Sequence, residues 1–236
     1  MRKYLLTIAS IGLLYCSAQN QTISMQSDFQ LFAQGASTGL NSSSLVSFTR
    51  KEETVGCQFL FKNWAKGMVT NKQGVSFSNG LFNYDKINKN LYILKGDTTF
   101  LVDKYQIQSV MLHDDANTDN YVLEKIPSLK TDDLYIVISK GAKYSLMKSV
   151  ETKLVLADFH TNGLISSGNK YDEFKDEYKY FVVFPDSASH DVSLKKKSIK
   201  SIFDTEKEKV DSFFKEHSGD ELNENFLSRL ITSLNQ

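Results

Sequence analysis

Short apolar runs alternate with turn-forming residues from residue 45 to about residue 184. The runs are rich in Val, Ile, Phe, Tyr and Thr, which favour β-strands. No segment long enough for a crossover helix separates them, so they predict antiparallel meanders rather than a parallel sheet. The clearest hairpin turn is Lys95-Gly96-Asp97. The runs that predict strands are 58–61, 67–70, 91–94, 98–102, 107–112, 134–138, 143–147, 154–156 and 178–184.

After Phe203 the apolar spacing becomes helical. Thr205 and Glu208 have the spacing of a capping box, which predicts a helix start. A turn at Ser218-Gly219 ends this helix, and a second helix follows from about residue 220. We expect the resulting αα-hairpin to dock on the chain's own sheet, with a partner protein as the alternative. The side chains expected to make this contact are Phe213, Phe214, Phe226, Leu230 and Ile231.

Together these patterns predict an α+β protein that is mostly antiparallel β, with a meander or barrel-like sheet and a C-terminal αα-hairpin. The stretch 35–44 consists mainly of Gly, Ser, Thr and Asn, which is typical of a flexible connection. The predicted organisation is a signal peptide at 1–18, a flexible N-terminal segment at 19–44, a β-rich domain at 45–203 and the helical hairpin at 204–236.

The first residues have the three-part layout of a secretory signal. Arg2 and Lys3 precede an apolar run at 4–15, and small residues follow. This layout predicts cleavage between Ala18 and Gln19 and a secreted or periplasmic protein. A lipidated Cys16 and an uncleaved anchor are the alternatives; Tyr15 is too large for the residue that precedes a lipidated cysteine.

The mature chain is close to neutral, because losing Arg2 and Lys3 lowers the 28 basic residues to 26, against 28 acidic residues. Such a balance argues against nucleic-acid binding, which needs clustered positive charge. No later run approaches the roughly 20 apolar residues of a transmembrane helix, so no transmembrane segment is expected in the mature chain.

Cleavage also leaves Cys57 as the single cysteine, which excludes an internal disulfide. We expect a buried, unreactive thiol packed under Phe59 and Phe61. The alternative is a reactive nucleophile, but no Lys, Arg or His lies within two positions to lower the thiol pKa.

The best metal candidate is Asp115-Ala116-Asn117-Thr118-Asp119-Asn120, where oxygen ligands alternate as at the start of a calcium loop. Asn120 stands where the loop needs Gly, and Ile126 stands where it needs a bidentate Glu. The sequence therefore predicts a polar turn here and no metal site.

Four histidines, His113, His160, His190 and His217, lack the spacing of a zinc pair. Asp158 and His160 alternate on a possible strand, and His190 adjoins Asp191, so an acid-oriented base is conceivable in either pair. The nucleophile is missing, because Gly74-Val75-Ser76-Phe77-Ser78 lacks the closing Gly of a nucleophile elbow. The acidic pairs Asp132-Asp133 and Asp172-Glu173 are typical of solvated loops, and a glycosidase pair is unsupported. We assign no catalytic or cofactor-binding residue and no cofactor.

Aromatic and basic clusters offer two further interpretations. Trp64 and the stretch Tyr171 to Tyr180 have the composition of a sugar-stacking or peptide-binding platform, although core packing is the commoner use of such residues. Lys195-Lys196-Lys197 is typical of a solvated face, with contact to anionic lipid as the alternative.

The run 59–69, followed by 81–85 and 91–93, resembles a recurrent block in uncharacterised secreted proteins of Bacteroidota. The C-terminal order of aromatic strand, Lys195-Lys196-Lys197 and helical pair is similar to the tail of that group. The resemblance covers most of the mature chain and implies a cell-envelope protein without an assigned activity. Asp97-Thr98-Thr99 and Asp186-Ser187-Ala188 are similar to the O-glycosylation sequon of that phylum.

These observations favour a secreted or periplasmic protein that binds a partner or supports an envelope assembly, with an envelope protein or a glycan as the partner. The alternatives are a secreted hydrolase that uses Asp158 and His160, and a carbohydrate-binding module. A pocket with converging polar groups would favour the hydrolase. The sequence assigns no oligomeric state.

Overall fold

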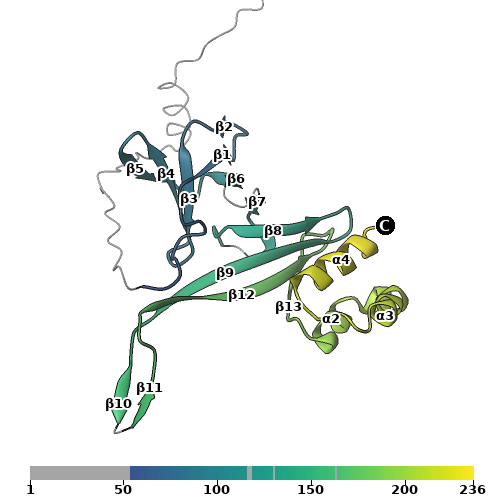
Figure 1. Cartoon of the computed structure of the whole chain (residues 1–236). Coiled ribbons are helices and arrows are strands. Elements are labelled where there is room, and N and C mark those ends of the chain that lie inside the picture. The colour runs from purple at the N-terminus through teal and green to yellow at the C-terminus, as the bar shows by residue number, and fades with distance from the viewer. Residues whose placement is uncertain (1–53, 116–118, 130, 163) are drawn as a thin grey trace, which may run out of the picture.

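The computed structural model of the protein describes residues 54–115, 119–129, 131–162 and 164–236 (Figure 1). The predicted signal peptide, its cleavage position and the predicted flexible segment lie outside these residues. The strands are β1 Ala65–Asn71, β2 Ser76–Phe77, β3 Leu81–Asp85, β4 Asn90–Lys95, β5 Thr98–Leu101, β6 Ile107–Asp114, β7 Asp119–Glu124, β8 Tyr135–Lys140, β9 Ser145–Val155, β10 His160–Asn162, β11 Ile165–Ser167, β12 Glu173–Val183 and β13 Ser189–Val192. The helices are α2 Lys196–Ile202, α3 Lys207–Glu216 and α4 Glu224–Leu234, with short 3₁₀ turns at Pro127–Leu129 and Asp204–Glu206.

Eleven of the strands form one sheet in the order β13-β12-β9-β8-β7-β6-β1-β3-β4-β5, with β2 paired to β1. Every strand pair in it is antiparallel, which confirms the predicted mostly antiparallel β class. Within the described residues no ladder joins β5 to β13. The sheet is therefore open, and the predicted barrel-like closure is not established.

The hairpin predicted at Lys95-Gly96-Asp97 is present between β4 and β5. Gly96 has φ +59°, a left-handed conformation that glycine adopts without strain and that suits a two-residue hairpin turn. The predicted strand at 58–61 is wrong, because only an isolated bridge from Phe59 to Asp85 forms there. The Asn83 side chain instead bonds the backbone of Phe61, with its Oδ1 accepting from the amide at 3.2 Å and its Nδ2 donating to the carbonyl at 3.0 Å.

β9 and β12 pair along their whole length, from Ser145 opposite Val183 to Val155 opposite Glu173. The runs 143–147 and 154–156, predicted as two strands, thus belong largely to one long strand. At one end this ribbon carries the helices, and at the other it leaves the rest of the sheet (Figure 1).

Two large cores lie on the sheet. The first fills the curled half made by β1 to β7 and includes Val69, Phe82, Ile93, Ile107 and Leu112, all at most 1% exposed. The Tyr84 hydroxyl donates to the Leu134 carbonyl at 3.4 Å, which ties β3 to the chain just before β8. The curl therefore brings the β3–β4 hairpin close to the β8–β9 side of the sheet.

The second core lies between the C-terminal helices and the ends of β8, β9 and β12. The side chains predicted to dock are buried there together with sheet residues such as Leu146 and Val182, which confirms docking on the chain's own sheet. The Asn235 side chain also accepts from the Lys143 and Tyr144 amides at 2.9 Å, fastening the end of α4 to the β8–β9 turn. None of the helices in the described ranges has the length and apolarity needed to cross a membrane.

The helix starts differ from the sequence prediction. The capping box at Thr205 and Glu208 is wrong: α3 begins after Glu206, with no side-chain cap bond, because the residues before it form a 3₁₀ turn. α4 is capped by Asn223, whose side chain accepts from the Phe226 amide at 3.0 Å. The helix α2, which the sequence did not predict, precedes both.

Candidate functional site

The ribbon of β9 and β12 continues into a projecting hairpin, residues 156–162 and 164–171, which we call the arm. Figure 1 shows its strands β10 and β11 standing away from the rest of the molecule. All described residues of the arm are exposed. No described residue of the arm is therefore buried against another part of the chain.

The arm carries large apolar side chains that are left in water. The tip residue Leu164 is fully exposed, and Ile165 beside it is 73% exposed. Leu156 is 64% exposed, and Phe159 and Tyr171 lie about half exposed. Single exposed apolar residues are ordinary on protein surfaces, whereas a cluster of them on one projecting element marks an interaction site.

The backbone of the arm is nevertheless well ordered by its own hydrogen bonds. The Asp158 and Phe159 amides both donate to the Asn169 carbonyl, at 3.1 and 3.0 Å. The Asn169 amide returns a bond to the Asp158 carboxylate at 2.6 Å. Gly168 between them has φ +90°, and a Cβ there would lie 2.5 Å from the Asp158 carbonyl oxygen, so only glycine fits. The sequence thus builds a defined bend between the ribbon and the hairpin.

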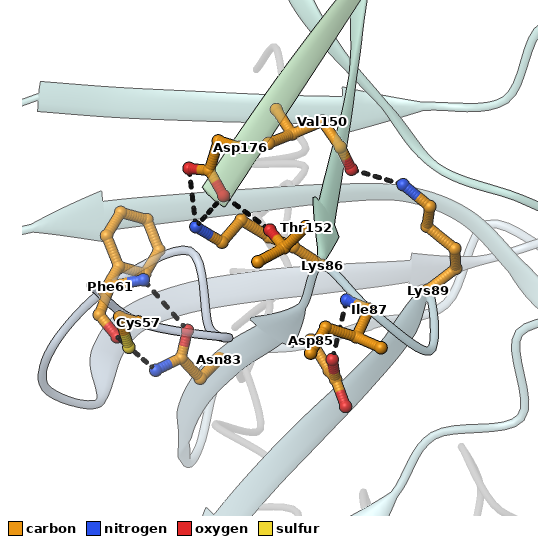
Figure 2. Close-up of polar contacts among 10 residues, drawn as sticks. All are labelled: Cys57, Phe61, Asn83, Asp85, Lys86, Ile87, Lys89, Val150, Thr152 and Asp176. Carbon is orange, nitrogen blue, oxygen red and sulfur yellow. Dashed lines mark hydrogen bonds and ion pairs between the residues drawn. The ribbon is translucent and has the colours of Figure 1, made fainter. Parts of the chain in front are cut away.

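A buried ion pair anchors the ribbon close to where the arm begins (Figure 2). The Lys86 ammonium, at the end of β3, donates to both carboxylate oxygens of Asp176 on β12, at 2.8 and 2.7 Å. The Lys86 side chain is only 7% exposed and that of Asp176 is 26% exposed. The Thr152 hydroxyl on β9 donates to the same carboxylate at 2.5 Å. One lysine of the body therefore contacts a group held by both strands of the ribbon.

The β3–β4 turn is shaped to present that lysine. The Asp85 carboxylate accepts from the amides of Ile87 and Asn88, at 2.9 and 3.1 Å, and so closes the turn on either side of Lys86. Lys89, on the same turn, donates to the Val150 carbonyl of β9. Burial lowers the pKa of Lys89. Two lysines of one turn thus hold the ribbon, and they fix the direction of the arm relative to the body.

A second contact reaches the base of the arm from the start of the described chain. The Val55 amide donates to the Asp172 carbonyl at 2.8 Å, and its carbonyl accepts from the Phe174 amide at 2.9 Å. This parallel bridge pairs Val55 with Glu173. Asp172 also bonds the Ala157 amide through its carboxylate, at 2.8 Å. The acidic pair Asp172-Glu173 therefore makes structural hydrogen bonds where the arm joins the ribbon.

The proposed hydrolase residues lie on the arm but do not form a catalytic triad. His160 Nε2 lies 3.0 Å from the Ser167 hydroxyl, and its Nδ1 lies 3.0 Å from the Asp158 carbonyl oxygen. The Asp158 carboxylate is turned to Asn169 instead of to the imidazole. All three residues are exposed, so water is not kept from them. Ser167 was not recognised from the sequence, because only the β10–β11 register brings it opposite His160.

The expected polar turn after β6 is described only in part, since residues 116–118 lie outside the described ranges. Asp115 pairs with Lys66 at 2.8 Å, and the hydrogen bond from that lysine lowers the pKa of the carboxyl. His113 contacts Asp115 at 3.3 Å. Across the described ranges, no three His, Cys, Asp or Glu side chains gather as metal ligands would.

The aromatic platform does not assemble. Tyr180 is buried, Tyr178 lies on β12, and Tyr171 lies on the arm outside that strand, so the three rings do not share one strand face. The Lys148 ammonium covers the Tyr178 ring at 5.2 Å. Trp64 lies half-buried beside β1, far along the chain from these residues.

The remaining charged candidates are placed as follows. The Asp132 carboxylate pairs with Lys125 at 2.7 Å, which lowers its pKa. His190, which lies on β13 at the edge of the sheet, packs edge-on against the Phe184 ring. Lys195, Lys196 and Lys197 are exposed at the start of α2. Of the two sequon-like sequences, 186–188 lies on a turn, whereas in 97–99 only Asp97 is on a turn and Thr98 and Thr99 begin β5; modification of either stays a prediction.

A hollow of about 350 Å³ lies beside β6 and β7, and its lining includes Lys72, Glu124, Lys125 and Lys140. Lys140 already pairs with Glu124 at 2.7 Å, and Lys125 pairs with Asp132. The charges that would hold a ligand are thus largely satisfied within the chain.

Cys57 lies before β1 and is only partly buried, so the expected full burial is not met, and the expected low reactivity stays a prediction. The segment forms bends instead of the predicted strand, which leaves the thiol beside the Phe61 carbonyl, at 3.8 Å, rather than under its ring. We expect slow reaction with a maleimide, about tenfold slower in the folded than in the urea-unfolded protein, because partial burial beside Phe61 restricts access to the thiol. Equal rates in the two states would contradict this prediction.

No protein-family model, characterised protein or solved structure matches the chain. Membership of the Bacteroidota group therefore stays a prediction from the residues that resemble it.

Proposed function

We propose that the protein is an exported, non-enzymatic binding or support protein of the cell envelope, and that it contacts its partner with the arm. The observation that carries this proposal is the exposure of every described arm residue, with Leu164 and Ile165 at its tip. A chain that orders a hairpin by internal hydrogen bonds and leaves its apolar side chains in water needs a partner to cover them.

The anchor supports the proposal. An isolated two-stranded hairpin is marginally stable in water, and a ribbon of two strands bends easily. The contacts of Lys86 and Lys89 with β9 and β12 hold the ribbon at the point where it leaves the sheet. Binding then costs less conformational entropy, because the arm already points in one direction.

Retention in the envelope tests the proposal. The double variant Leu164→Ser/Ile165→Ser should leave the envelope fraction of the source organism and appear in the soluble exported fraction, since it removes the apolar tip without touching the body. Val75→Ser is the matched control, because Val75 is an exposed aliphatic residue outside the arm, at 42% exposure. Ultracentrifugation followed by immunoblotting measures the distribution. Unchanged sedimentation of the double variant would sink the proposal.

A further inference from the structure

We infer that the occupant of the arm tip is the surface of a lipid bilayer, into which Leu164 and Ile165 insert. This inference rests on the proposed function, because it names what the same arm contacts. Its basis is the order of side-chain chemistry along the arm, the absence of charge near the tip and the small apolar area that the tip offers.

From its tip to the bend the arm changes from apolar to uncharged polar. At the bend and beyond it, charged and apolar side chains are mixed, because Phe159, Leu156 and Tyr171 are exposed there as well. Leu164 and Ile165 are at the end, at 105% and 73% exposure. Behind them lie uncharged hydrogen-bonding side chains that face one another across the hairpin, such as Thr161 and Ser166, whose hydroxyls are 3.2 Å apart. The charged residues Asp158 and Lys170 come only at the bend. A bilayer interface has the same order, from acyl chains through ester and headgroup oxygens to water.

The sequence carries no Asp, Glu, Lys or Arg from residue 161 to residue 169. A charged protein surface or an acidic glycan would be matched by charge at the contact, and the tip offers none. It also offers little area. Two aliphatic side chains present on the order of 200 Å², against about 800 Å² per partner in a stable protein interface.

Backbone N–H and C=O groups that enter an apolar medium need hydrogen-bond partners, and the hairpin supplies them internally. Three antiparallel pairs, from His160 with Ser167 to Asn162 with Ile165, bond the strands to each other up to the turn. Shallow insertion of about 5–10 Å places only Leu164 and Ile165 below the headgroups. The polar side chains behind the tip then stay at the level of lipid oxygens.

Binding of the purified mature protein to phosphatidylcholine vesicles tests the inference. We expect measurable co-sedimentation that changes little with added phosphatidylglycerol or with salt, because the tip is uncharged. Leu164→Asp should weaken it by at least about tenfold, whereas Val75→Asp, which places the same charge at an exposed aliphatic site outside the arm, should not.

A second measurement detects insertion directly and does not rely on a variant that binds more weakly. The chain has one tryptophan, Trp64. Leu164→Trp adds one at the tip, and brominated lipid should quench its fluorescence while the wild-type protein with Trp64 alone stays unquenched.

The inference is overturned if the wild-type protein does not bind the vesicles, if Leu164→Asp binds as well as wild type, or if Trp at position 164 is not quenched. Should the tip still be required for retention in native envelopes, the occupant is a protein or a glycan, and the proposed function stands. If changing the tip affects neither vesicle binding nor retention in envelopes, both the inference and the proposed function are wrong.

Discussion

Phe226→Asp is expected to destabilise the protein by at least about 4 kcal/mol, which is most of the margin of a typical domain. Phe226 is 1% exposed in the second core, where its ring meets Phe213 edge-on at 5.3 Å and Phe214 at 5.1 Å. The variant loses this packing, together with the contact of the Arg229 guanidinium 6.0 Å from the ring centroid, and places a short carboxylate in an apolar core. Urea unfolding followed by circular dichroism measures the change.

Asn225→Asp is the matched control, because it adds the same charge one position earlier on an exposed face of α4. It lies in the first turn, where a carboxylate is favourable to the helix, so its stability should stay within about 0.5 kcal/mol of wild type. If Phe226→Asp unfolds no earlier than this control, the helices do not depend on docking to the sheet.

Asp176→Ala is expected to cost about 3 kcal/mol, because it leaves the Lys86 ammonium buried without a partner. For a chain of this size that corresponds to a fall in melting temperature of about 6–12 °C. The Thr152 hydroxyl loses its acceptor in the same variant. Differential scanning calorimetry measures the shift.

Two comparisons make this prediction specific. Glu177→Ala removes the neighbouring pair with Lys153, whose side chains are 49% and 63% exposed, and should cost less than about 1 kcal/mol. Lys86→Met/Asp176→Leu should be more stable than Asp176→Ala, since no unpaired buried charge remains. A loss in Asp176→Ala no larger than in Glu177→Ala would mean that Lys86 does not anchor the ribbon.

The sequence predicted well those elements whose structure depends mainly on residues close together in the chain. The β4–β5 hairpin follows from Gly96 between two β-rich runs, and the docking of α3 and α4 follows from apolar stripes too wide to stay in water. The strand at 58–61 failed because a distant side chain, Asn83, takes the backbone bonds that a ladder would have used.

The arm and its anchor were beyond sequence reasoning for the same kind of reason. Lys86 and Asp176 are 90 positions apart, and only the curl of the sheet brings them together. Leu164 and Ile165 were indistinguishable from core residues, because a run of apolar letters does not show whether anything covers it. The signal that was available is the uncharged, Gly-containing stretch 161–169 between two long β-rich runs, which is typical of a hairpin.

Amide hydrogen exchange of residues 156–171 is the most direct measurement of whether the arm is the binding element. It needs no mutation and compares the purified mature protein with the same protein added to isolated envelopes. We predict that the amides nearest Leu164 exchange at least about tenfold more slowly in the envelopes, while exchange in β1 to β7 stays unchanged. Equal exchange of the arm in both samples, or protection confined to the body, would contradict the account.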